Sequence, residues 1–186
     1  MRRSHLFFLC LVIAGAALVA AWRPAVGARQ ATPAASAADT IVAPLRDAAG
    51  QEVGLAAFTT GDDGQARVTV IAAGLTPGEH GIHVHETGTC DPAGEKPFSL
   101  AGGHFNPTGG MHGEHAGDLG NLTADADGDV LFVGSSDRFA LTAGDTPLLD
   151  ADGAALVIHA DPDDLVTDPA GNSGTRVFCA VIAAGS

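Results

Sequence analysis

Hydrophobic and polar residues alternate along this chain in short runs, which are separated by clusters of glycine, aspartate and other turn-forming residues. Alternation over roughly four to eight residues is typical of a strand with one buried and one solvated face. Turn-forming sequences at 61–64 and 125–128 predict hairpins. The predicted strands are 41–46, 53–59, 67–72, 80–86, 130–133, 154–159 and 177–183.

This pattern also predicts the fold class. No stretch after the N-terminal segment shows a sustained helical period with caps, so we expect little helix. Short strands with frequent turns predict an all-β fold, an antiparallel Greek-key β-sandwich or flattened barrel of about eight strands. Two long connections, 87–118 and 160–175, interrupt the strands. Because long ordered loops in compact domains are usually functional, we expect both to have a functional role.

The N-terminal segment has a different character from the rest of the chain. Two arginines precede an apolar run from 6 to 21, and small residues follow, which is the order of a secretory signal cleaved after Ala28. The run is shorter than the roughly 20 residues of a spanning helix, which favours cleavage over an uncleaved membrane anchor. Cys10 lies inside the run rather than at its end, which argues against a lipoprotein.

We therefore expect three parts. Residues 1–28 are a signal peptide, 29–38 are a small, polar, flexible linker, and 39–186 form the β-sandwich domain. The protein would be periplasmic or extracellular, and it would contact a membrane only if the N-terminal segment stayed uncleaved.

Charge and cysteine content limit the partners of the protein and predict a disulfide. Removal of residues 1–28 leaves six basic and 22 acidic residues, a formal charge of −16. Such a surface repels nucleic acid and anionic lipid, so neither is an expected partner. Two cysteines remain, Cys90 and Cys179, and a lone pair outside the cytoplasm predicts one disulfide rather than two buried thiols.

Histidine placement is the main indication of chemistry. Strand alternation places His83 and His85 on one face, with Ile82 and Val84 on the other. This pair alone would favour two surface histidines on a polar strand face, because the spacing is a weak signal. However, the first long loop adds further candidate ligands and another strand ends in a histidine. Neutral imidazoles suit copper and zinc, and a set with one carboxylate suits zinc, so two unlike metal sites are indicated. The additional candidates are His104, His112, His115, Asp118 and His159.

Four segments, in the expected order, resemble the signatures of copper/zinc superoxide dismutases. They are Gly-Ile-His-Val-His-Glu at 81–86, Gly-His-Phe-Asn-Pro at 103–107, Gly-Asp-Leu-Gly-Asn at 117–121 and Gly-Asn-Ser-Gly-Thr-Arg at 171–176. The resemblance extends from about residue 39 to the C-terminus. It implies an enzyme that converts superoxide to dioxygen and hydrogen peroxide, with one copper and one zinc per chain, and it leaves a homodimer open.

The resemblance also implies a role for each matching residue. His104 would bridge both metals and take part in catalysis, and Arg176 would attract and orient the anionic substrate. Asp163 would link a copper ligand to a zinc ligand, and Cys90 and Cys179 would form the family's disulfide. The implied copper ligands are His83, His85, His104 and His159, and the implied zinc ligands are His104, His112, His115 and Asp118.

The chain departs from the family pattern in both loops. Only Gly113 and Glu114 separate His112 from His115, whereas familiar members have several more residues there. The second loop lacks the acidic and lysine cluster found in many members, so steering is expected to depend more heavily on Arg176.

Three interpretations stay open at this point: a copper/zinc dismutase, a copper-only dismutase, and a copper-binding or metal-buffering protein without turnover. We interpret His80 as structural, and Lys96 and Arg138 as solvated surface residues.

Overall fold

The computed structural model describes residues 40–93, 96–142 and 144–182. The expected signal peptide, linker and first domain residue lie outside these ranges, as do residues 183–186. Within them, none of the helices has the length and apolar character needed to cross a bilayer. The strands are β1 (Thr40–Asp47), β2 (Glu52–Thr60), β3 (Ala66–Ala72), β4 (Gly78–His85), β5 (Asp118–Ala124), β6 (Val130–Ser136), β7 (Ala154–His159) and β8 (Arg176–Ile182).

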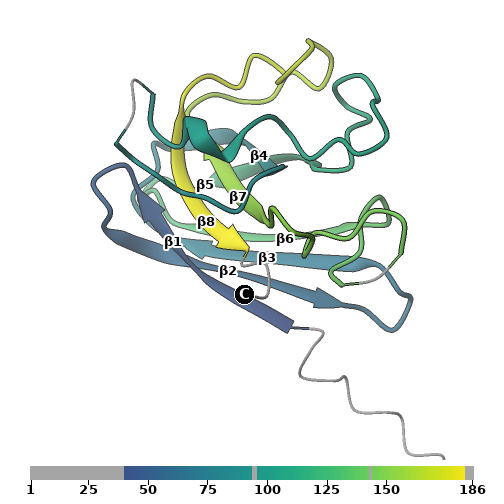
Figure 1. Cartoon of the computed structure of the whole chain (residues 1–186). Helices are drawn as coiled ribbons and strands as arrows, with labels where there is room; N and C mark the ends of the chain where they lie inside the picture. The colour runs from purple at the N-terminus through teal and green to yellow at the C-terminus, as the bar shows by residue number, and fades with distance from the viewer. Residues whose placement is uncertain (1–39, 94–95, 143, 183–186) are drawn as a thin grey trace, which may run out of the picture. The chain divides into compact units, whose positions relative to one another are not determined.

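The strands form one sheet that curls into two facing layers. Hydrogen bonding joins them in the order β5-β4-β7-β8-β1-β2-β3-β6, and each neighbouring pair is antiparallel. In Figure 1, β1, β2, β3 and β6 form one layer and β4, β5, β7 and β8 the other. The terminal strands β5 and β6 approach each other, so the sheet is a nearly closed barrel. The predicted all-β sandwich or flattened barrel is confirmed.

Alternation along the strands builds the core between the layers. In β3 the residues alternate between buried and more exposed positions, and in β4 Ile82 and Val84 are fully buried in the main core. All six residues of β7 are buried. Leu156 and Ile158 face the main core, whereas Ala155 and Val157 pack in a second cluster beneath the first long loop. This covering loop explains why β7 is apolar on both faces.

Three features of the fold differ from the sequence-based expectations. Strand β5 was not among the named candidates, because its residues Asp-Leu-Gly-Asn-Leu-Thr-Ala alternate only weakly. The turn at 125–128 exists, with Gly128 donating to Asp125 O at 3.1 Å. It does not make a paired hairpin among the described residues, because β5 pairs with β4 while β6 pairs with β3. A third long connection, 137–153, joins β6 to β7.

The two predicted long loops lie on the layer that contains β4, β7 and β8. The first, 86–117, runs from β4 to β5 and contains the short 3-10 helix η2 (Ser99–Ala101), and the second, 160–175, joins β7 to β8. Figure 1 shows both at the same end of the domain. A disulfide between Cys90 and Cys179 ties the first loop to β8 across 89 residues of sequence.

Removing this disulfide should destabilise the domain substantially. Replacing both Cys90 and Cys179 with serine frees a long loop in the unfolded chain, which is worth about 4 kcal/mol in the chain-entropy account. The midpoint of thermal unfolding of the metal-free protein should therefore fall by roughly 10 °C. Circular dichroism measures the change, and Ser135→Ala, at an exposed serine of β6, is the control. A fall of less than about 2 °C would contradict this account.

Candidate metal centre

Two groups of buried side chains share one histidine. The donor atoms of each group lie within 4.8 Å of one another, and every member is buried. His104 belongs to both groups. The first contains His83, His85, His104 and His159, and the second contains His104, His112, His115 and Asp118.

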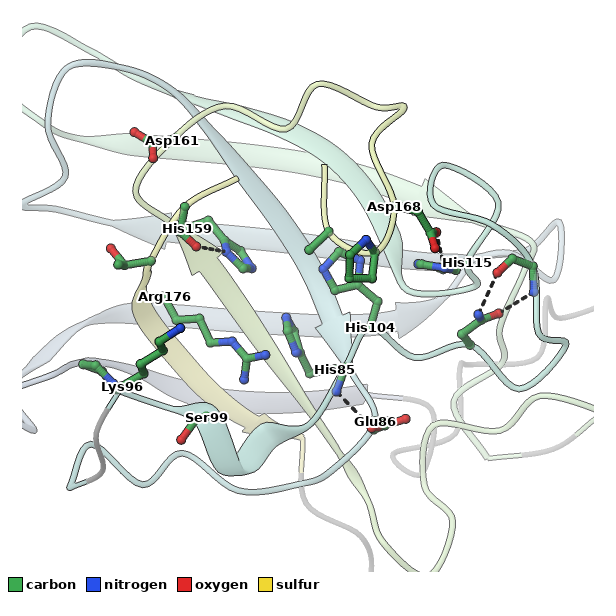
Figure 2. A pocket seen from close by; sticks show the side chains of 18 residues that line it. His85, Glu86, Lys96, Ser99, His104, His115, His159, Asp161, Asp168 and Arg176 are labelled. Atoms are coloured by element: carbon green, nitrogen blue, oxygen red, sulfur yellow. Dashed lines mark hydrogen bonds and ion pairs between the residues drawn. The ribbon is translucent and has the colours of Figure 1, made fainter. Parts of the chain in front are cut away.

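Strands and a loop bring the first group together. His83 and His85 lie on β4 and point away from the core that contains Ile82 and Val84, as the alternation predicted. His159 ends the neighbouring strand β7. His104 comes from the first loop, whose backbone forms an isolated bridge with His85. The rings of His83 and His104 stack with centroids 3.9 Å apart. Figure 2 shows His85, His104 and His159 converging on one side of a pocket.

The second group takes three of its four members from one short segment, 112–118. His112 and His115 lie in the first loop, and Asp118 is the first residue of β5, directly opposite His83 in the strand register. Asp118 Oδ1 accepts a hydrogen bond from His104 Nδ1 at 2.7 Å. Its other oxygen, Oδ2, accepts from the backbone N–H groups of Gly113 at 2.7 Å and His115 at 3.1 Å. The segment therefore folds around its own carboxylate.

Outer hydrogen bonds fix the orientation of most of the rings. His85 Nδ1 donates to Gly102 O at 3.0 Å, and His159 Nδ1 lies 3.4 Å from Gly174 O. Asp163 accepts from two rings at once, from His83 Nε2 at its Oδ2 and from His112 Nε2 at its Oδ1, both at 2.8 Å. Asp163 therefore lies between the two groups, where the resemblance implied it would.

Each of the six histidines keeps one buried ring nitrogen without a hydrogen-bond partner. These atoms are His83 Nδ1, His85 Nε2, His104 Nε2, His112 Nδ1, His115 Nδ1 and His159 Nε2. Buried polar atoms are normally paired, because leaving one unpaired costs roughly 1–3 kcal/mol. In four of the rings an acceptor outside both groups takes the N–H, and in His104 the acceptor is Asp118 of the second group, so each of these five rings keeps a nitrogen with a free lone pair. Converging lone pairs in this number fit metal cations.

The protonation states suit the same ligands. Burial, together with the neighbouring His104, lowers the pKa of His83 to about 2. Burial also lowers the pKa of His159 to about 4 and that of His85 well below its usual value. Burial alone would raise the pKa of Asp118, but the hydrogen bond and charge of His104 and the Gly113 N–H bring it to about 2. Neutral imidazoles and an ionised carboxylate are the metal-binding forms.

Arg176 lines a cavity of about 940 Å³ that opens onto the first group. Its Nη1 donates to Phe98 O and its Nη2 to Gly102 O, each at 2.6 Å. Gly102 O thus accepts from both Arg176 and His85, so one carbonyl orients a cation and a ring of the first group. A Cβ at Gly102, where φ is +77°, would lie 2.6 Å from Glu86 Oε1, so the loop requires glycine there.

The structure adds detail on three residues that the sequence assigned to the surface or to a structural role. Lys96, which was expected to be an ordinary surface residue, is exposed but lines the same cavity as Arg176 (Figure 2). Arg138 bonds to the backbone of the second group's segment. His80 is buried outside both groups, with Nδ1 2.7 Å from His159 O and Nε2 2.8 Å from Thr76 O. No periodic signal could have indicated the Lys96 and Arg138 contacts, since both residues lie in irregular segments.

The chain is similar in sequence to known proteins. Residues 52–182 match the family model of copper/zinc superoxide dismutase. The Cu-Zn superoxide dismutase of Deinococcus radiodurans is 39% identical over 160 residues, which cover 78% of this chain and 85% of the relative.

Solved structures agree. A SOD-like protein from Bacillus subtilis has a TM-score of 0.71 and 36% identity, covering 76% of this chain and 97% of that one. The Cu/Zn superoxide dismutase from Brucella abortus has a TM-score of 0.65 and 29% identity, covering 78% of this chain and 100% of that one. The agreement of sequence and fold shows that the chain belongs to the copper/zinc superoxide dismutase family.

Proposed function

We propose that this chain is an exported superoxide dismutase that holds one copper ion and one zinc ion, with His104 shared between them. The observation that carries the proposal is the pair of buried donor groups with six unpartnered ring nitrogens. Family membership supports the activity, and the donor chemistry supports the assignment of each metal.

The donor types differ between the groups. Four imidazole nitrogens, from His83, His85, His104 and His159, form a nitrogen-only set of the kind that suits copper. Three imidazoles and the carboxylate of Asp118 form the second set, which suits tetrahedral zinc. Because this second set is complete, we propose that zinc is retained despite the short segment between His112 and His115.

His104 is the proposed bridge. Its Nδ1 bonds Asp118 of the second group, while its Nε2 is buried without a partner and its ring stacks on His83 of the first group. Release to solvent of the proton that His104 Nδ1 shares with Asp118, as metal binding requires, would free that nitrogen as a second donor. Both ring nitrogens would then serve as donors, one to each group.

The chemistry divides between the metals and the chain. Bound copper would supply a one-electron redox couple for converting two superoxide anions and two protons to dioxygen and hydrogen peroxide, and zinc a redox-inert charge. His104 Nε2, which is buried and free of hydrogen bonds, is the atom at which the chain can hold and release a proton. Arg176 would bind and orient the anion, and Asp163 would hold His83 and His112 in place.

Export is part of the same proposal. A signal peptide at 1–28 and a linker at 29–38 would deliver the domain 39–186 to the periplasm or the cell exterior. The Cys90–Cys179 disulfide is consistent with such an oxidising compartment.

Metal analysis of the mature protein, paired with a superoxide-removal assay, tests the proposal. We expect one copper and one zinc per chain with activity. His104→Ala should lower activity by at least a hundredfold, whereas Glu114→Gln, between two ligands but in neither group, should change it less than twofold. Activity with copper and no zinc would instead indicate a copper-only dismutase, and bound metal without turnover would indicate a metal-buffering protein.

Arg176 should control capture of the anion. Because Arg176→Gln removes a half-buried positive charge from the cavity, we expect kcat/KM to fall by roughly 10- to 100-fold and its salt dependence to weaken. Arg176→Lys should recover part of the loss, and Arg46→Gln, at an exposed arginine paired with Glu52, should be neutral. Stopped-flow kinetics at several ionic strengths, with copper content checked, makes the measurement. Undiminished activity in Arg176→Glu would refute this role.

Lys96 should make a smaller contribution to capture. It lines the cavity but is exposed, so salt screens it more than Arg176. We expect Lys96→Gln to lower kcat/KM by roughly two- to fivefold at low ionic strength and hardly at all in 0.5 M salt, and Lys96→Arg to match the unmodified protein. A decrease that persisted unchanged in high salt would argue against steering.

A further inference from the structure

The segment that carries the second donor group is anchored by an arginine from another part of the chain. Arg138, which follows β6, donates from Nη1 to Gly113 O at 3.0 Å and from Nη2 to Asp118 O. These carbonyls lie at the two ends of the stretch 113–118, which contains His115 and ends at Asp118. Arg138 itself belongs to neither donor group.

An aspartate from the second long loop holds the same segment at its beginning. Asp168 Oδ1 accepts the backbone N–H of His112 at 2.7 Å and lies 3.9 Å from His115 Nε2. In Figure 2, Asp168 lies beside His115, at the edge of the cavity. Side chains from two separate elements thus bond the backbone at 112, 113 and 118.

Other backbone hydrogen bonds from distant parts of the chain reach only the C-terminal part of the segment, where Gly117 O accepts from Val84 N and Gly117 N donates to Phe105 O, both at 2.8 Å. The segment's N–H groups at Gly113 and His115 bond to Asp118 Oδ2, which is itself a candidate ligand. Gly113 adopts φ +88°, and a Cβ there would lie 2.9 Å from Leu165 O, so the backbone passes close to the second loop. With only two residues between His112 and His115, small backbone shifts would move both imidazoles. Anchors that do not bind the metal are therefore needed to keep the three side chains convergent.

We infer that Arg138 and Asp168 are positioning residues that hold 112–118 in its ligating arrangement before zinc binds. The inference rests on the proposed function, since it assigns zinc to the second group. Two parallel N–H donors on a rigid guanidinium can span both carbonyls, which a lysine ammonium cannot do with the same geometry. Loss of partners that orient ligands typically weakens metal binding by roughly 10- to 100-fold.

Zinc affinity of the metal-free protein, measured by chelator competition, tests the inference. Arg138→Gln and Asp168→Ala should each raise the zinc dissociation constant at least tenfold and leave the copper dissociation constant within about threefold. Asp168→Asn, which keeps an oxygen acceptor, should recover most of the affinity, whereas Arg138→Lys should recover little. Arg67→Gln and Asp63→Ala, which break an exposed ion pair on the β2–β3 hairpin, are the matched controls and should change neither constant.

Hydrogen exchange separates positioning from general instability. In the metal-free variants, amides in 112–118 should exchange at least tenfold faster, while those of β1 to β3 keep their rates. The inference would be overturned if both Arg138→Gln and Asp168→Ala had zinc dissociation constants within twofold of that of the unmodified protein. It would also be overturned if copper and zinc affinity fell in parallel and amides exchanged faster throughout the sheet.

Measurements on the unmodified protein distinguish failure of the proposed function from failure of the positioning role. If it binds zinc but removes no superoxide, the proposed function fails, and the variant affinities still decide the role of Arg138 and Asp168. If it removes superoxide and binds zinc, and the variants bind zinc as tightly as it does, only the positioning role fails. A protein that takes up no zinc would overturn the positioning role outright.

Discussion

The structure depends on keeping six imidazoles buried with one unpaired nitrogen each. Each unpaired nitrogen costs roughly 1–3 kcal/mol of free energy. Burial also lowers the pKa values of His83, His85 and His159, so these three rings stay neutral near pH 7. The chain alone cannot relieve this cost, because the acceptors that the chain supplies already bond the other nitrogen in five of the rings. The surrounding barrel and the Cys90–Cys179 disulfide must therefore supply the stability that holds the rings together.

Two polar groups couple this cluster to its surroundings. Asp163 joins His83 to His112, so a displacement in one donor group is transmitted to the other through a single carboxylate. The loop must approach closely to place it, since a Cβ at Gly171 would lie 1.8 Å from Asp163 Oδ1. On the opposite side, Gly102 O joins His85 to Arg176. The orientations of Arg176 and of the His85 ring are thus set by the same loop backbone.

Sequence patterns predicted the features of the site that depend on strand geometry. Alternation was sufficient to separate His83 and His85 from Ile82 and Val84, because strand side chains have a strict period of two. It failed for β5, whose glycine and asparagine weaken the pattern, although the motif at 117–121 still identified Asp118. The position of Lys96 at the cavity was not predictable in this way, and neither were the contacts of Arg138 and Asp168. These contacts join irregular segments up to 56 residues apart, and no local period encodes such distances.

The short second loop keeps its shape without the charge cluster expected of the family. Asp164 accepts hydrogen bonds from the hydroxyl and N–H of Thr167, from Val166 N and from Asn172 Nδ2, and these donors hold its pKa below the usual range. An ionised Asp164 is thus committed to the loop's own backbone. Asp168 is similarly committed to His112. Asp164 and Asp168 therefore act on structure, whereas Asp161 of the same loop lines the cavity together with Arg176 and Lys96. Under the proposed function, attraction of an anion toward a protein of strongly negative charge would fall to these two cations.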